Sequence, residues 1–193
     1  SASKVPMLPL DFCRFDKLTS LTLRGQKRPE EKDLKWFTSL PATLTHLTLL
    51  VIGMKGVDLM DLPPRLVQRN VQNPIAEVPS NFFSRLPVHL RSLALAGMLP
   101  TITVEVPFNV LPRTMEILIL TGIRLSRGWV ADLPPNLKDL SMHQLQDFFL
   151  DSPCPRSLGR LFAGSSAFQG RPLADSIRFL PPGMQSLSIP SPA

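Results

Sequence analysis

One apolar pattern recurs eight times along this chain and constrains its fold more than any other feature of the sequence. In its clear form, a Leu-Pro step is followed by apolar residues four, seven and nine positions after its Leu, as in Leu40-Pro41 with Leu44, Leu47 and Leu49. The complete copies begin at Leu40, Leu86, Leu111, Leu133 and Leu180, and three weaker copies are anchored at Leu18, Leu66 and Leu158. Successive copies lie 21 to 26 residues apart. A fixed period in this range predicts stacked structural units.

The last part of each copy predicts a β-strand. Residues 46–50 (HLTLL), for example, alternate with a period of two. About 20 residues of crossover join one such segment to the next, so the strands must run in the same direction. We therefore expect a parallel sheet in a right-handed coil, with the repeated leucines pointing inward and the residues between them lining a concave face.

The segments that return from one strand to the next vary more than the strands. Residues 29–37 and 173–179 have features of short helices, whereas residues 101–106 (TITVEV) alternate like an extended segment. We therefore expect irregular or short helical returns on the convex side.

The L-x-x-L-x-L spacing resembles the leucine-rich repeat, and the Leu-Pro opening resembles the LP-containing subclasses of that family. The resemblance covers about residues 14 to 190. It implies an α/β solenoid of about eight units, with a single array over residues 1–193 that is complete or part of a longer chain. The Asn or Cys that usually stands three residues after the last Leu of each unit, where it bonds the turn backbone, is absent here. The turns must therefore satisfy their backbone groups in another way.

Composition and cysteine positions favour an intracellular, cytoplasmic protein. The chain is 44% hydrophobic, yet no apolar run reaches transmembrane length and no signal-peptide pattern opens it. Cys13 and Cys154 fall in the first and seventh copies. Strands stacked about 4.8 Å apart would separate them by about 30 Å, too far for a disulfide. Extracellular leucine-rich arrays commonly end in disulfide-stapled caps, and this sequence shows none.

The residues that alternate with the inward leucines supply the candidate binding face. Most are small or hydroxylic, but Ile117 and Ile119 form an apolar island, and Phe162 follows two copies later. An apolar and aromatic patch with polar neighbours is typical of a protein-binding surface. The predicted partner-binding residues are Leu50, Ile117, Ile119, Asp139, His143 and Phe162. The alternative is that loops cover these residues, or that they only favour strand formation.

Basic residues recur where the predicted strands begin, namely at Arg65, Arg91, Arg113, Lys138 and Arg156. The chain carries a net charge of +6, so an aligned basic rim could grip phosphates or an acidic partner. The alternative is a solvated edge that keeps an apolar array soluble. No recognition helix, phosphate-binding loop or zinc spacing supports nucleic-acid binding specifically.

The sequence offers no catalytic constellation. His46 and His143 would stand roughly 20 Å apart, too far to share a metal or a proton. Asp139 and His143 share one strand face and form a possible orienting pair, but no obvious Ser or Cys nucleophile stands on an elbow beside them; Ser141 between them is a common strand residue. We therefore predict a non-enzymatic scaffold without metal, cofactor or small-molecule substrate, which binds another protein. The alternative function is an RNA- or phosphate-contacting structural subunit of a large complex.

Overall fold

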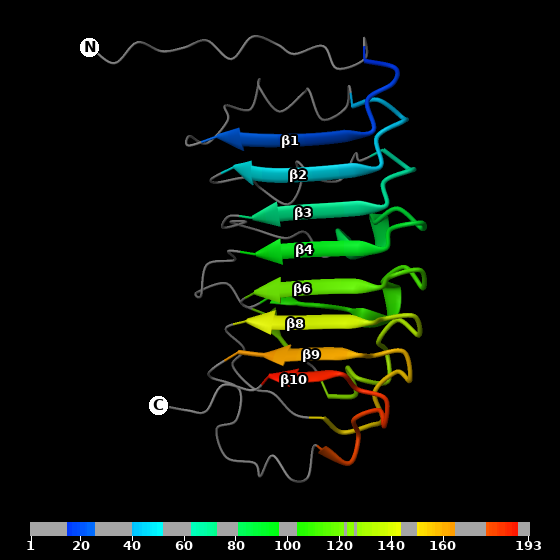
Figure 1. Ribbon diagram of the computed structural model, residues 1–193, viewed down its shortest axis with the longest axis vertical. Coiled ribbons are helices and arrows are strands. Elements are labelled where there is room, and N and C mark those ends of the chain that lie inside the picture. The colour runs from blue at the N-terminus through cyan, green and yellow to red at the C-terminus, as the bar shows by residue number, and fades with distance from the viewer. Residues whose placement is uncertain are drawn as a thin grey trace, which may run out of the picture.

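The computed structural model describes residues 15–25, 40–51, 63–72, 81–96, 104–121, 123–125, 127–143, 150–164 and 177–188. Eight strands in these segments form one sheet, in the order β1-β2-β3-β4-β6-β8-β9-β10 (Figure 1). They are β1 (Ser20–Gly25), β2 (His46–Val51), β3 (Gln68–Gln72), β4 (Ser92–Ala96), β6 (Ile117–Thr121), β8 (Asp139–His143), β9 (Arg160–Ala163) and β10 (Ser186–Ser188). All neighbours are parallel, and each strand comes from one copy of the repeated pattern. The predicted parallel sheet is confirmed, and the chain forms a solenoid of stacked coils.

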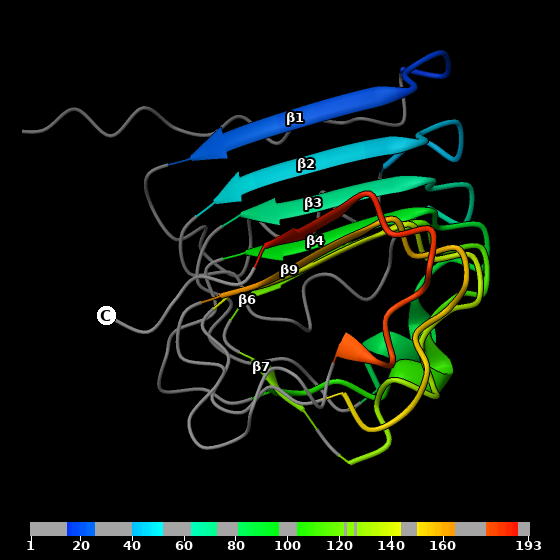
Figure 2. The same cartoon turned by 60° about the horizontal axis from the view of Figure 1, so that its bottom comes forward.

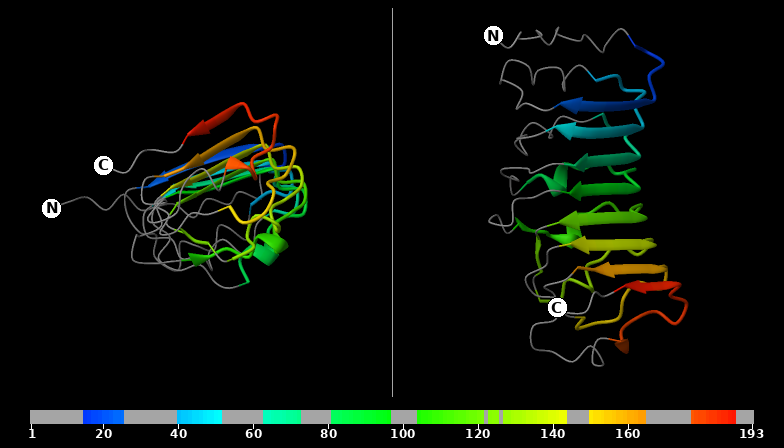
Figure 3. Two further views of the ribbon diagram at one scale, coloured as in Figure 1. Left: turned by 90° about the horizontal axis from the view of Figure 1, so that it is seen from below. Right: turned by 60° about the vertical axis from the view of Figure 1, so that its left-hand side comes forward.

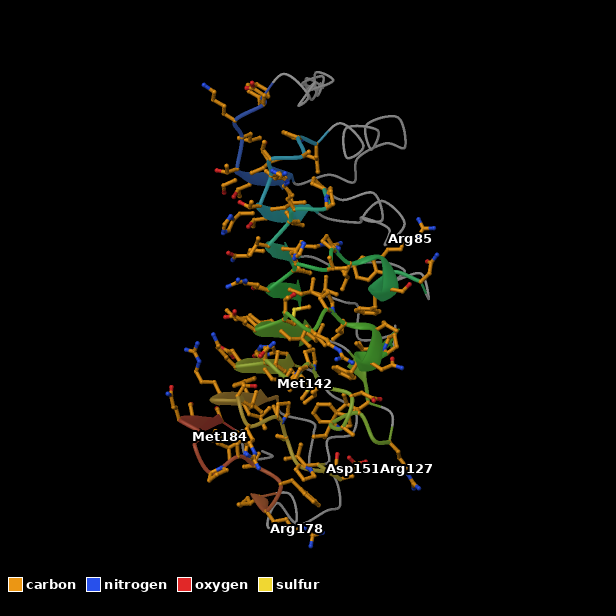
Figure 4. The ribbon with its side chains drawn as sticks, turned by 90° about the vertical axis from the view of Figure 1, so that its right-hand side faces the viewer. Arg85, Arg127, Met142, Asp151, Arg178 and Met184 are labelled. Carbon is orange, nitrogen blue, oxygen red and sulfur yellow. The ribbon has the colours of Figure 1, made fainter. Side chains whose placement is uncertain are left out.

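The register aligns equivalent positions of the copies across the sheet. Leu93 of β4 pairs with Leu118 of β6, which pairs with Leu140 of β8, and all three side chains are buried. Because one face of each strand is apolar, a slip of one residue would expose every one of these leucines, so burial fixes the register. Figure 4 shows Met142 in this interior, whereas Arg85, Arg127 and Arg178 point away from it.

Every strand of the large sheet is preceded by the same turn, and the Leu-Pro step provides this turn in the copies that contain one. The carbonyl of Pro41 accepts a hydrogen bond from the N–H of Leu44 (3.0 Å), and the equivalent bond recurs in each later copy. Pro suits this position because its φ is restricted and its missing N–H is not needed there. In the first copy the carbonyl of Phe15 accepts from Leu18 in the same way. The turn therefore depends on the carbonyl rather than on the proline ring, which explains how a copy without Leu-Pro still forms a strand.

A column of short polar side chains joins one turn to the next. Thr43 Oγ1 donates to the carbonyl of Leu18 (3.0 Å), and Thr114 Oγ1 lies 3.0 Å from the carbonyl of Leu90. Asn136 Nδ2 donates to the carbonyl of Arg113, and Ser157 Oγ to that of Leu137. We call Thr43, Thr114, Asn136 and Ser157 the polar column. Each member directly precedes the first repeated apolar residue of its copy, so hydrogen bonds at the start of the strand satisfy carbonyl groups of the preceding turn.

The described parts of the returns lie on one side of the sheet and complete the core (Figure 2). Phe83 of the 3-10 turn η4 (Phe83–Arg85) and Phe108 of η5 (Phe108–Val110) are both buried, as is Val130. Each of the three stands three residues before the Leu of its Leu-Pro step, a recurrence that the shorter pattern does not include.

Helical returns are confirmed only in a reduced form. The described returns contain these two 3-10 turns and one helical residue, Ile177. Residues 29–37 and 173–176 lie outside the described residues. The prediction of an extended segment in residues 101–106 is confirmed for β5 (Val104–Glu105), which pairs with β7 (Ile123–Arg124) in a small second sheet.

Candidate protein-binding surface

One face of the large sheet is left uncovered by the described segments (Figures 2 and 3). The side chains on this face alternate with the buried leucines, and we call it the open face. Most of its described side chains are exposed or half-buried; Ala94 and Thr121 are the buried ones. The face expected to bind a partner is therefore accessible within the part of the chain that the structure describes.

Strands β6 and β9 place apolar side chains on the open face, and β8 between them contributes a serine and a histidine. The register aligns Ile119 of β6 with Ser141 of β8 and Ser141 with Phe162 of β9. Ile117 lies two residues before Ile119, and the ring of His143 stacks on that of Phe162 with 4.6 Å between centroids. We call Ile117, Ile119, His143 and Phe162 the apolar patch. All four are half-buried, so each keeps surface that a partner can cover.

The position of His143 is set by Ser141 rather than by Asp139. Ser141 Oγ lies 2.9 Å from Nε2 of His143, because residues two apart in a strand share a face. Asp139 instead pairs through Oδ2 with Arg160 of β9 at 2.9 Å, and no described contact joins it to His143. The suggested Asp139–His143 pair is therefore not formed. The serine–histidine hydrogen bond orients the imidazole on Phe162 and does not form a triad with Asp139.

Two of the predicted rim residues are neutralised in part by a carboxylate that the sequence analysis overlooked. Glu116 lies between Lys138 (2.8 Å) and Arg91 (3.4 Å). The hydrogen bond from Lys138 lowers the pKa of Glu116, and the charges of Lys138 and Arg91 lower it further. The three residues follow the first apolar residue of their copies, and the backbone bonds Glu116 N–H to Arg91 carbonyl and Lys138 N–H to Glu116 carbonyl align them. Aligning the copies would have revealed this triplet.

The remaining rim residues, Arg65, Arg113 and Arg156, are exposed in the turns and have no ion pair among the described residues. They stand one or two positions before the first apolar residue of their copies, so they form no single column with Arg91 and Lys138. We call the segments 63–68, 87–92, 112–117, 134–139 and 155–160 the basic edge. Its basic side chains are Arg65, Arg91, Arg113, Lys138, Arg156 and Arg160; with Glu116 and Asp139 its net charge is +4.

Arg69 occupies a leucine position in the core. The register places it between Leu47 and Leu93, and its side chain is only 1% exposed. Its guanidinium lies 4.7 Å from the ring centroid of Phe82, while Nε and Nη2 have no hydrogen-bond partner. Desolvation by burial lowers the pKa of Arg69 to about 9. At neutral pH the interior therefore holds a positive charge, and the described contact that stabilises it is the face of the Phe82 ring.

The prediction for Leu50 is not tested by the described residues. Leu50 belongs to β2, but its side chain lies outside what the structure describes, as does Cys13. Cys154 is free and buried, and desolvation raises its pKa to about 11, so it is a packing residue.

Among the described residues, no three His, Cys, Asp or Glu side chains lie close enough together to hold a metal ion. Nor does any helix in that part have the length and hydropathy needed to cross a bilayer.

The chain has no match among models of protein families, curated proteins or solved structures. The class of protein is therefore defined by the chain's own architecture, a parallel-strand solenoid of stacked repeats.

Proposed function

We propose that this chain is a leucine-rich-repeat-type solenoid that binds another protein through its open face. The repeated spacing, the in-register parallel strands and the shared turn support the repeat type, and the polar column offers a substitute for the asparagine ladder. One observation carries the binding role: Ile117 and Ile119 of β6 and Phe162 of β9 stay half-buried on a face that no described segment covers. Apolar area of this kind gains about 25 cal/mol per Å² when a partner removes it from water.

A second candidate function rests on the basic edge, whose net charge of +4 favours contact with phosphate groups. The ion pairs of Arg91, Lys138 and Arg160 count against it, because a phosphate must compete with Glu116 and Asp139 for these cations. We therefore place an RNA-contacting role second.

The test of the proposed function is a pull-down from native extract with quantitative mass spectrometry. Ile119→Asp puts a negative charge in the apolar patch. Thr22→Asp is the matched control, because it introduces the same charge in the same row of the open face, on the distant β1. We expect proteins captured by the wild type and by Thr22→Asp to be lost with Ile119→Asp, while circular dichroism shows that all three fold. Equal capture by the two variants would refute binding through the apolar patch.

A further inference from the structure

The apolar patch and the basic edge lie on the same strands. Arg160 begins β9, and Phe162 stands two residues later on the same face. Asp139 stands in the same relation to Ser141 in β8, and Glu116 directly precedes Ile117 at the start of β6. A partner segment that covers the patch therefore reaches the ion pairs at its border.

These ion pairs turn their cations toward solvent. The side chains of Arg91, Lys138 and Arg160 are 64%, 63% and 62% exposed, whereas those of Glu116 and Asp139 are 29% and 24% exposed. A guanidinium has five N–H donors and an ammonium three, so each cation can bind a second carboxylate while it keeps the first. The two carboxylates cancel part of the charge of the three cations, but the cations are the more exposed groups, so the surface that a partner meets is positive.

We infer that the partner is a protein segment in which an apolar or aromatic side chain is followed by acidic residues. This inference rests on the proposed function and specifies its partner. The apolar side chain contacts Ile119 and Phe162 across the shorter Ser141, and the carboxylates bind Arg160, Lys138 and Arg91. An apolar anchor beside charge-complementary contacts is a common arrangement in protein recognition.

The strand geometry sets the spacing of the partner residues. Phe162 and Arg160 are two residues apart in β9, which an extended partner matches with two residues of its own. Lys138 and Arg91 flank Glu116, which directly precedes β6, and β6 lies two strands from β9, about 10 Å away. An extended chain advances about 3.3 Å per residue, so about three residues separate the carboxylate that binds Arg160 from the one that binds Lys138 and Arg91. The expected segment therefore carries an acidic residue two positions from its apolar anchor and another about three positions further on.

The test uses synthetic fluorescent decapeptides and the full chain in fluorescence anisotropy. The probe carries Phe with Glu at the second and fifth following positions. Its controls replace both Glu by Gln, both Glu by Lys, or Phe by Ala, and a ten-nucleotide oligouridylate tests RNA. We expect the Gln peptide to bind about tenfold more weakly than the probe and the Lys peptide not to bind, because the exposed cations repel it.

Variants of the protein test the contacts with the acidic residues and the contact with the apolar residue separately. Arg160→Gln and Lys138→Gln are each expected to weaken probe binding by about threefold to tenfold, whereas Lys17→Gln, an exposed lysine in the turn before β1, leaves it unchanged. Ile119→Asp is expected to abolish probe binding. Thermal melts of each variant separate a lost contact from a lost fold.

Two sets of results would contradict the inference. If the Gln or Lys peptides bind as well as the probe, or if no peptide binds while capture from extract still depends on Ile119, the acidic partner is refuted and the proposed function stands. If oligouridylate binding depends on Lys138 and Arg160 and is unchanged by Ile119→Asp, while neither peptide binding nor capture from extract depends on Ile119, both the inference and the proposed function are refuted in favour of the RNA-contacting role.

Discussion

At the scale of single residues, the buried Arg69 is the clearest departure from the repeated pattern. Its long apolar stem can fill a leucine position, and the face of Phe82 attracts the guanidinium. These contacts leave Nε and Nη2 without acceptors, and a buried charge without a partner is unfavourable. The third copy thus keeps its place in the register at a cost in stability.

Arg69→Met is expected to stabilise the protein. Methionine keeps most of the side-chain volume and removes the charge, so the free energy of unfolding in urea at pH 7 should rise by about 1–4 kcal/mol. Arg65→Met is the matched control, because Arg65 is exposed in the turn of the same copy and its replacement should change stability by less than about 0.5 kcal/mol. A loss of stability in Arg69→Met would show that the guanidinium is bonded in solution.

The advantage of Arg69→Met should also depend on pH. Burial lowers the pKa of Arg69 to about 9, so above that pH the folded wild type releases a proton that the unfolded chain still binds. Stability rises with pH wherever the unfolded state binds more protons, so the wild type gains stability above pH 9. The difference between Arg69→Met and wild type should therefore shrink between pH 8 and pH 10.5, and a constant difference would contradict the lowered pKa.

At the scale of turns and strands, the polar column adds side-chain hydrogen bonds between copies that the backbone of the sheet and the buried leucines already join. Thr114→Val keeps the shape of the side chain and the β-propensity but removes the donor to the carbonyls of Val88 and Leu90. We expect the free energy of unfolding to fall by about 1 kcal/mol. Thr22→Val, on the exposed open face of β1, is the control and should change stability by less than about 0.5 kcal/mol. Equal effects of the two changes would show that the column contributes nothing.

The strands could be predicted from the sequence because their signal is local. The period of two in residues 46–50 and the Leu-Pro step before it lie within one copy, and burial of Leu47 follows directly. The apolar patch was also predictable, since the parallel register follows from the repeat. The Arg91–Glu116–Lys138 contact follows from the same register, with members 25 and 22 residues apart, but the prediction of the rim considered basic residues alone and left out Glu116. The pairing of Asp139 with Arg160 also follows from this register.

At the scale of the whole molecule, stability is expected to vary along the solenoid. Each coil contacts only its neighbours, so the local core decides how easily a coil opens. In the middle, Leu118 and Leu140 are fully buried, whereas the equivalent Leu187 of β10 is 40% exposed. All three residues of β10 are exposed, and β9 is its one described neighbour in the sheet (Figure 3). The middle of the solenoid therefore buries more apolar surface per strand than β10 does.

Hydrogen exchange measured residue by residue should report this gradient. Amides of β6 and β8 should exchange slowest, because opening them exposes a complete core, and amides of β10 should exchange roughly a hundredfold faster through local opening. Addition of the acidic decapeptide should slow exchange in β6, β8 and β9, where the apolar patch lies, and leave β1 unchanged as an internal control. Uniform exchange along the chain would instead mean that the solenoid opens only as a single cooperative unit. A stable centre that carries the binding face, beside coils that open more readily, would let the partner contact the most rigid part of the molecule.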